Sequence, residues 1–145
     1  MEKTPGTGRR IRRPGTSAMT ATRYELILAL VQTIPAGFLA SYAQIAGYLP
    51  AVGARQVGYA LSGRRPLPPD LPWHRVVNAR GAVSAHAGAA EQRRRLDAEG
   101  IVFDRQGRAN WRRYRWPGPS HVWLLAHGLD PADSSIWDAA ANKQV

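Results

Sequence analysis

The chain of 145 residues contains no cysteine. Disulfide bonds, thiolate metal sites and a cysteine nucleophile are therefore excluded. No apolar run approaches the roughly 18 residues of a membrane-spanning helix, and the basic N-terminus is not followed by the apolar segment of a secretory signal. A length of 145 residues has room for one globular domain with tails. We expect a monomer without metal, cofactor or membrane partner. We expect it in the cytoplasm, associated with the nucleoid if the cell is bacterial.

Acidic residues and lysine are scarce. Ten Asp and Glu stand against 20 Lys and Arg, of which 18 are arginine, and the formal net charge is +10 with a pI near 11.2. Guanidinium groups bind phosphate through two parallel hydrogen bonds, and so basic a protein is typical of nucleic-acid binding. A GC-rich genome that favours arginine codons would give the same bias without that function.

The charge is uneven along the chain. Residues 1–18 have a net charge of +4 and little to bury, which predicts a disordered basic arm. Residues 19–116 have a net charge of +8 and the apolar periodicity of a folded domain. Residues 117–145 have a net charge of −2 and begin with a Pro-Gly-Pro boundary signal. This predicts a C-terminal tail whose apolar residues 122–125 could pack back on the domain.

Two capping boxes indicate helix starts. Thr22 and Glu25 precede apolar residues at helical spacing, and Pro35 ends that pattern. A second box, S-x-x-Q, begins at Ser41 and opens a short helix. A third helix is predicted over residues 54–61, after a turn. Two short helices joined in this way are typical of a helix-turn-helix, whose second helix usually meets DNA.

The second half of the chain predicts short strands around one helix. Residues 73–77 and 82–84 indicate the two strands of a hairpin turning at residues 78–81, and a hairpin in this place would be a wing. A helix is predicted over residues 89–99. Further short strands are predicted at residues 101–103 and near Tyr114. The fold class is therefore predicted as α+β, a winged-helix-like DNA-binding domain with a helix-turn-helix.

The sequence P-W-H-R-V at residues 72–76 resembles the P-C-H-R-V core of the O6-alkylguanine-DNA alkyltransferases. Trp73 stands where those enzymes have their acceptor cysteine. Over about residues 22–116 the chain is similar to the alkyltransferase-like proteins, the non-enzymatic branch with tryptophan at this position. The other segments that carry the resemblance are Ser41-Tyr42, Gln44-Ile45-Ala46, Ala54 to Gly58, Asn78-x-Arg80-Gly81, Glu91-Gln92-Arg93, Glu99-Gly100-Ile101 and Tyr114-Arg115-Trp116.

The resemblance implies a protein that binds double-stranded DNA, flips O6-alkylguanine out of the duplex and flags it for nucleotide excision repair proteins without reacting with it. Direct dealkylation needs an activated nucleophile, normally a thiolate, which a chain without cysteine cannot supply. Affinity is expected to come from arginine–phosphate contacts. Selectivity is expected from the easier extrusion of a weakened base pair and the fit of the pocket.

Four residues are predicted to act on the DNA. By the resemblance, Arg55 enters the base stack to fill the gap left by the extruded nucleotide, and Tyr42 pushes the 3′ phosphate. Gly58 would let the helix lie close to the duplex, and Arg75 could contact a phosphate. The residues alone also allow a plain phosphate contact for Arg55 and a core position for Tyr42. Equally, Gly58 could serve helix packing, and Arg75 could brace the hairpin.

The lesion pocket is predicted to contain Trp73, His74, Val76, Ser84 and His86. Trp73 would be its wall, although a core aromatic is the alternative, and His74 could hold a structural hydrogen bond. His86 stands where alkyltransferase-like proteins have an arginine that senses the base, and Ala87 stands where alkyltransferases have a contacting serine. The donor at the lesion edge is therefore expected to be weak or pH-dependent.

Two other functions stay open at this point. A sequence-specific winged-helix transcription regulator would read base edges whether or not a lesion is present. An enzyme using His74 and water would release the alkyl group or the base. The neighbouring Arg93, Arg94 and Arg95 are expected to form a solvated helix face.

Overall fold

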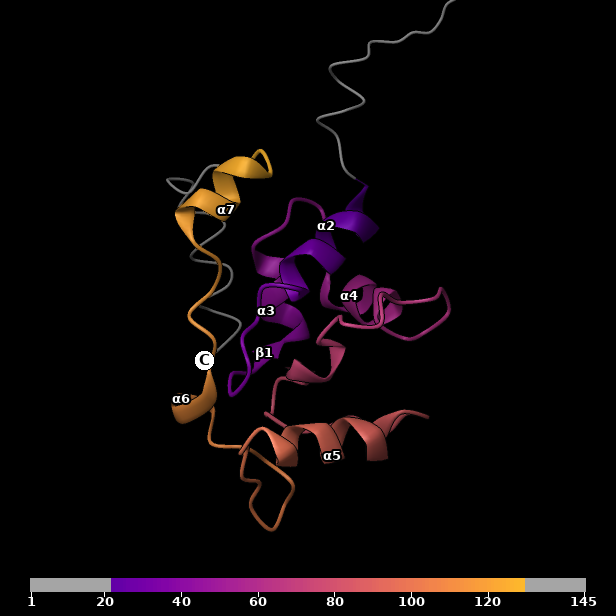
Figure 1. Cartoon of the computed structure of the whole chain (residues 1–145), viewed down its shortest axis with the longest axis vertical. Coiled ribbons are helices and arrows are strands. Elements are labelled where there is room, and N and C mark those ends of the chain that lie inside the picture. The colour runs from indigo at the N-terminus through magenta and orange to yellow at the C-terminus, as the bar shows by residue number, and fades with distance from the viewer. Residues whose placement is uncertain (1–21, 130–145) are drawn as a thin grey trace, which may run out of the picture.

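The computed structural model describes residues 22–129. The predicted basic arm of residues 1–18 and the chain beyond residue 129 lie outside this range. Helices α2 (Arg23–Val31), α3 (Tyr42–Gly47) and α4 (Ala54–Ala60) gather on one side of a two-stranded sheet, and α5 (Ala89–Ala98) lies on the other (Figure 1). The arrangement confirms an α+β fold with a helix-turn-helix.

The start of α2 is the predicted capping box. The backbone N–H of Glu25 donates to Thr22 Oγ1 at 3.0 Å, and the N–H of Thr22 donates to Glu25 Oε1 at 2.9 Å. The helix ends at Val31, earlier than the periodicity indicated. Ile34 follows in a turn and is nevertheless 1% exposed, so its burial continued the apolar pattern beyond the helix.

The helix-turn-helix consists of α3 and α4, at the predicted places. Ser41 Oγ accepts a hydrogen bond from the N–H of Gln44, as in a capping box. The second half of that box is wrong, because the Gln44 amide donates to the carbonyl of Trp116 at 2.8 Å. Gln44 is 1% exposed, and a buried amide must find a partner where the fold offers one. This bond ties α3 to the end of the domain.

The sheet pairs β1 (Ala40–Ser41) in parallel with β2 (Val76–Val77). On the other side of β1, Leu39 forms a parallel bridge with Arg115. The N–H of Leu39 donates to the carbonyl of Tyr114, and the N–H of Trp116 donates to that of Leu39, both at 2.7 Å. Three distant segments of chain therefore meet at residues 39–41.

The predicted first strand of the hairpin is wrong. Residues Trp73–Arg75 form a 3-10 turn, η1, in which the N–H of Arg75 donates to the carbonyl of Pro72. Only Val76 and Val77 are extended, and both are fully buried, which suits a parallel strand covered on both faces. The turn at residues 78–81 is confirmed, but Ala82 bridges to Arg108. A wing of the predicted form is absent from residues 22–129.

The segment after α5 also differs from the prediction. Residues 101–103 contribute a single antiparallel bridge, from Phe103 to Ala109. The segment near Tyr114 is the short helix α6 (Trp111–Tyr114), not a strand. Asn110 starts this helix by accepting a hydrogen bond from the N–H of Arg113. An N-cap signal at Asn110 therefore outweighed the β propensity of the aromatic residues.

The core has two parts, one on each side of the sheet. The larger is enclosed by α2, α3 and α4 and includes Leu30, Ile45, Val57 and Val76. The smaller includes Leu96, which α5 contributes. After residue 116 the chain forms α7 (His121–Ala126), whose Leu124 is 1% exposed and belongs to the larger core. Among the described helices none is long and apolar enough to cross a membrane.

Replacing Leu124 with Ala should lower the free energy of unfolding by about 2–5 kcal/mol, because it leaves a cavity in the larger core. Leu125→Ala is the matched control. Its side chain is 64% exposed, and the change should stay within about 0.5 kcal/mol. Urea unfolding measures both. Equal stabilities of the two variants would mean that the segment after residue 116 does not contribute to the folded domain.

Candidate nucleic-acid interface

A pocket of about 570 Å³ opens beside the helix-turn-helix. Its wall on one side comes from α3, α4 and the loop that follows α4, and on the other from Trp73 and residues 84–88. Five of the predicted site residues line it: Tyr42, Gly58, Trp73, Ser84 and His86. Segments far apart in the sequence therefore form one cavity next to the helix expected to meet DNA.

Trp73 is partly buried and lies between two imidazole rings. Its ring centroid is 6.2 Å from that of His74 and 6.4 Å from that of His86, both edge to face. The guanidinium carbon of Arg95 lies 5.4 Å from the indole centroid. A Cβ on Gly88 would be 3.1 Å from the His86 ring and 3.5 Å from the indole, so the His86 ring would have to shift by a few tenths of an ångström to admit a side chain there. The indole orientation is thus fixed by its neighbours.

His86 is held in one tautomer by a chain of hydrogen bonds. The buried amide of Gln92 donates to the carbonyls of His74 and Val76, so its oxygen is an acceptor. His86 Nε2–H therefore donates to that oxygen at 2.8 Å, while His86 Nδ1 accepts from the N–H of Gly88 at 3.0 Å. Neither nitrogen can bind a ligand unless one of these bonds breaks.

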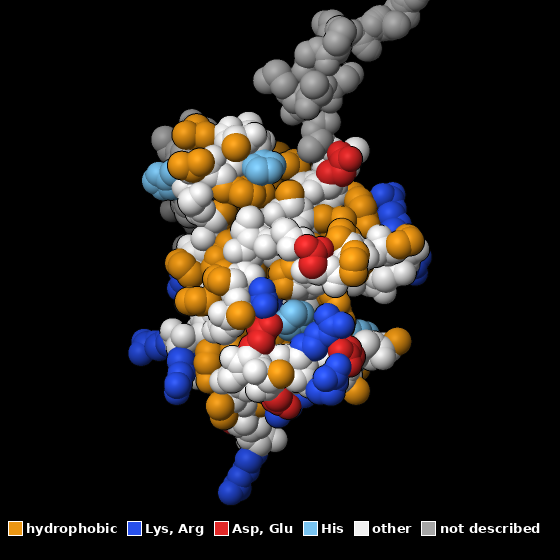
Figure 2. Space-filling model, in the orientation of Figure 1, with side chains coloured by type: hydrophobic (Ala, Val, Ile, Leu, Met, Phe, Trp, Pro, Cys, Tyr) orange, Lys and Arg blue, Asp and Glu red, His pale blue; other side chains and the backbone are white. Residues whose placement is uncertain are grey.

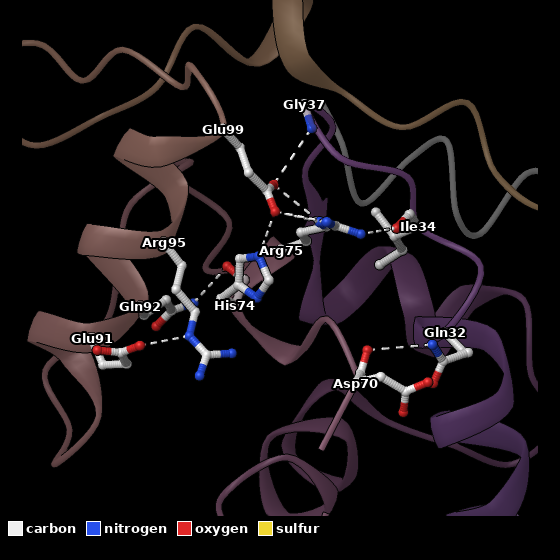
Figure 3. A network of polar contacts seen from close by, with 10 residues as sticks. All are labelled: Gln32, Ile34, Gly37, Asp70, His74, Arg75, Glu91, Gln92, Arg95 and Glu99. Carbon is white, nitrogen blue, oxygen red and sulfur yellow. Dashed lines mark hydrogen bonds and ion pairs between the residues drawn. The ribbon is translucent and has the colours of Figure 1, made fainter. Parts of the chain in front are cut away.

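A carboxylate joins the end of α5 to η1 (Figure 3). Glu99 accepts three hydrogen bonds of 2.7–3.1 Å from Arg75 and one of 2.8 Å from His74 Nε2. Arg75 also donates to the carbonyl of Ile34 at 2.6 Å. Burial alone would raise the pKa of Glu99, but the hydrogen bonds from Arg75 and His74 outweigh it and lower that pKa to about 2.

His74 is neutral in this network. Burial lowers its pKa more strongly than the hydrogen bond to Glu99 raises it. Since Nε2–H donates to the carboxylate, Nδ1 carries the lone pair, and this buried atom has no partner within residues 22–129. His74 is not among the residues that line the pocket. Its position agrees with the structural hydrogen-bond role that the sequence left open.

Two more predicted site residues lie behind the pocket and do not line it. Val76 is fully buried in strand β2, where its carbonyl accepts the Gln92 bond. Arg75 is mostly enclosed, with a side chain 17% exposed, and its guanidinium is directed at Glu99 and Ile34. It braces the backbone of the site, and a phosphate contact for Arg75 stays a prediction.

Arg55 lies in the first turn of α4 and is exposed. It makes no hydrogen bond or ion pair within the described part of the chain, and its charge is therefore uncompensated there. Gly58, one turn later, would place a Cβ in open space, with no described heavy atom within 4 Å. Internal packing therefore does not explain the glycine. Together the two positions present a bare, basic face of α4.

Tyr42 begins α3 immediately after the N-cap residue Ser41. Its ring is half-buried against the larger core, as the alternative prediction had it, and it also lines the pocket. Its action on a phosphate stays a prediction. Burial raises the pKa of its hydroxyl, which keeps the proton on the oxygen at neutral pH. The group is thus available as a hydrogen-bond donor at the pocket rim.

The arginines of α5 differ from Arg55 because they have acidic partners. Glu91 pairs with Arg94 at 2.6 Å and with Arg95 at 2.7 Å, and Asp97 pairs with Arg93 at 3.1 Å. Figure 2 shows blue and red side chains interleaved on this part of the surface. The expected solvated helix face is therefore also largely neutralised.

The family described as "6-O-methylguanine DNA methyltransferase, DNA binding domain" matches residues 22–101, more than half of the chain. The chain belongs to this family. The match covers both the helix-turn-helix and the segment around Trp73, which the structure brings together at one pocket.

Several members of the family are similar over most of their length. Alkyltransferase-like protein 1 of Schizosaccharomyces pombe is 34% identical over 105 residues, which are 69% of this chain and 93% of that protein. The DNA base-flipping proteins of Vibrio parahaemolyticus and Escherichia coli are 38% and 39% identical, over 91% and 68% of their lengths and 62% and 60% of this chain. The resemblance to alkyltransferase-like proteins is confirmed.

A solved structure shows the same fold. The S. pombe protein in complex with damaged DNA containing O6-carboxymethylguanine superposes with a TM-score of 0.54 at 36% identity, covering 64% of this chain and 93% of that one. A second structure of the S. pombe protein with DNA gives a TM-score of 0.55 at 37% identity, with the same coverage.

Sequence reasoning missed two residues on which the site depends. In the sequence, Glu99 and Gln92 stand out only as parts of family-like segments. Glu99 orients His74 and Arg75, and Gln92 fixes His86. The available signal was weak: a carboxylate at the end of a helix before glycine, and a glutamine on a helix otherwise rich in charge. Neither spacing indicates which distant side chain is the partner.

Glu99→Gln should destabilise the domain by about 2–4 kcal/mol at pH 7, somewhat less than for a fully buried pair, because Arg75 loses its charge partner. The folded-state pKa of Glu99, about 2, lies below the reference value of 4.5. Its ionised form therefore stabilises the fold above the reference pKa, and this contribution is lost as the pH falls through the folded-state value. Urea unfolding over a pH series should show the difference between wild type and variant shrinking across this interval.

Asp97→Asn on the same helix is the control. It removes a carboxylate from an exposed pair, whose contribution to stability is about 0–1 kcal/mol. If Glu99→Gln unfolds like Asp97→Asn at every pH, the carboxylate does not hold the site together.

Proposed function

We propose that this chain binds double-stranded DNA and holds an extruded O6-alkylguanine in the pocket beside Trp73 without reacting with it. The proposal depends above all on one observation. A cavity of about 570 Å³, large enough to admit a base, adjoins the exposed basic face of α4 and carries tryptophan where the alkyltransferases have their acceptor cysteine. The solved complex of the S. pombe relative with DNA containing O6-carboxymethylguanine, and the base-flipping names of the bacterial relatives, support it.

Binding would begin with the unpaired arginines on and near α4, which attract the phosphate backbone. Gly58 lets the backbone of α4 approach the duplex, and Arg55 is free to enter the space that an extruded nucleotide leaves. Tyr42, at the rim, presents a protonated hydroxyl toward the phosphate of the rotated nucleotide. The base then lies in the pocket, where the Trp73 indole offers apolar contact to the alkyl group.

The site lacks the group that a transfer reaction needs. His74 and Glu99 form a positioned imidazole–carboxylate pair, but no cysteine exists in the chain to receive the alkyl group. A hydrolytic reaction would need His74 to direct a water at the base, whereas its ring is buried and outside the pocket lining. We therefore propose a sensor and not an enzyme.

The bound complex would mark the lesion for nucleotide excision repair proteins and shield it from alkyltransferases. This part of the proposal follows the resemblance of the site. A monomer acting in the cytoplasm, at the nucleoid in a bacterium, would suffice, because one chain contains the pocket and the α4 face together.

The protein should bind an O6-methylguanine duplex more tightly than the same duplex with guanine, and leave the base unchanged. Anisotropy titrations of both duplexes give the affinity ratio, and mass spectrometry of the digested DNA and of the intact protein detects any loss of methyl. Loss of methyl from the DNA would contradict the sensor. Equal affinities combined with a preference for one duplex sequence would indicate a transcription regulator.

Trp73→Ala is the companion variant for this measurement. It should stay folded and retain affinity for plain duplex, while its preference for the alkylated base shrinks, because the partly buried indole walls the pocket. A core role would instead cost about 3–5 kcal/mol of folding stability. An unchanged lesion-to-plain ratio in a folded variant would remove Trp73 as a reader of the base.

Arg55→Ala should weaken binding to the lesion duplex by about 1–3 kcal/mol, the scale of base-level contacts and unstacking costs. Tyr42→Ala should act similarly and Tyr42→Phe less. Arg93→Ala removes the same charge from a surface where Asp97 already compensates it, and should have a smaller effect that fades in high salt. Wild-type affinity in both alanine variants at Arg55 and Tyr42 would refute their part in extrusion.

A further inference from the structure

A second groove, of about 380 Å³, lies against α2, α4 and the loop after α4. Arg65 is the one lining residue that the groove shares with the lesion pocket, and the groove uses other positions of α4. Gly58 and Leu61 line the lesion pocket, whereas Gln56, Tyr59 and Ala60 line the groove. The polar and aromatic residues of the groove are Arg23, Tyr24, Gln56, Tyr59, Arg64 and Arg65.

The groove is strongly basic. Three arginines line it, and no acidic residue is among its lining. No ion pair to Arg23, Arg64 or Arg65 occurs within residues 22–129, unlike the three consecutive arginines of α5, each of which has a carboxylate partner. The groove therefore retains its positive charge for a partner outside the described chain.

Two of these arginines are ordered by tyrosines and not by acids. The guanidinium of Arg64 lies 4.8 Å from the centroid of Tyr59, and that of Arg65 lies 4.3 Å from the centroid of Tyr24. Neither guanidinium donates a hydrogen bond within residues 22–129, so the N–H donors of both remain available to an anion. Because the side chains are already ordered, less conformational entropy is lost on binding.

Arg65 connects the groove to the lesion pocket, since it lines both. A molecule that follows the exposed face of α4 from the pocket thus meets the groove without crossing an acidic side chain of either lining. Because the groove continues the surface around the pocket, duplex DNA is favoured as its partner over a separate acidic peptide. The bidentate geometry of a free guanidinium fits a phosphate diester.

We propose that the groove formed by Arg23, Tyr24, Gln56, Tyr59, Arg64 and Arg65 binds the DNA sugar–phosphate backbone outside the lesion. This proposal rests on the proposed function, which places DNA on α4. It adds a contact that supplies affinity without reading the base, because phosphate contacts carry no sequence or lesion information directly. The protein would therefore hold plain DNA through this groove before any base is extruded.

The test compares Arg64→Ala with Arg94→Ala in salt titrations on plain and O6-methylguanine duplexes. Both variants lose one positive charge from an exposed side chain, but Arg94 is paired with Glu91. Arg64→Ala should weaken binding to both duplexes by the same factor, about two- to tenfold, and should reduce the slope of log affinity against log salt by about 0.9. Arg94→Ala should leave the slope unchanged.

Tyr59→Leu is the second variant, because it keeps the charge of Arg64 and removes only the ring beneath it. It should lower affinity for both duplexes by a smaller factor than Arg64→Ala, with the salt slope retained. Thermal melting checks that each variant is folded. Affinity and slope equal to the Arg94→Ala control, in both groove variants, would overturn the proposal and leave an acidic peptide as the remaining class of partner.

The plain duplex separates this proposal from the previous one. Should wild-type protein bind lesion and plain DNA equally, the lesion pocket is misassigned, yet the slope difference on plain DNA still supports the groove. Should Arg64→Ala change the lesion-to-plain ratio with no change in slope, the groove acts on the pocket through Arg65 and the backbone assignment is wrong.

Discussion

The carboxylate of Glu99 is the constraint on which the rest of the site depends. It lies at the end of α5 and accepts hydrogen bonds from Arg75 and His74 of η1. Arg75 also donates to the carbonyl of Ile34, which follows α2. One acidic group therefore joins the helical half of the domain to the half that carries α5. Residues 74 and 75 cannot shift without breaking these bonds. The backbone of Trp73, the residue before them, is held by its own N–H bond to the carbonyl of Leu71.

The same network gives the histidine–carboxylate pair beside Trp73 a structural role. The chain has no cysteine thiol from which the pair could take a proton. The bond between His74 and Glu99 nevertheless holds the 3-10 turn that carries the indole. Gln92 adds a second tie, from α5 to the carbonyls on either side of Arg75. His74, Glu99 and Gln92 therefore position the turn that carries Trp73, a lining residue of the pocket.

Local signals predicted the helices well, and non-local partners explain what they did not predict. Capping residues such as Thr22 and Ser41 act within one turn, so their effect is visible in the sequence. The predicted hairpin is wrong because Val76 and Val77 pair with β1, 36 positions earlier. The strand predicted near Tyr114 is wrong because Asn110 caps a helix there. Of the predicted site residues, five line the pocket, and Val76, His74 and Arg75 support it from behind.

Strand β1 ends at Ser41, and the same residue is the N-cap of α3, so no linker separates the sheet from the helix-turn-helix. Leu39 is bonded to the segment at Arg115 on one side, and Ala40 and Ser41 pair with β2 on the other. Tyr42, the first residue of α3, therefore directly follows the end of a strand that is bonded on both sides. In the proposed complex the duplex, and not this anchored surface, would have to deform, so that the sequences and lesions that bend most easily would fit best.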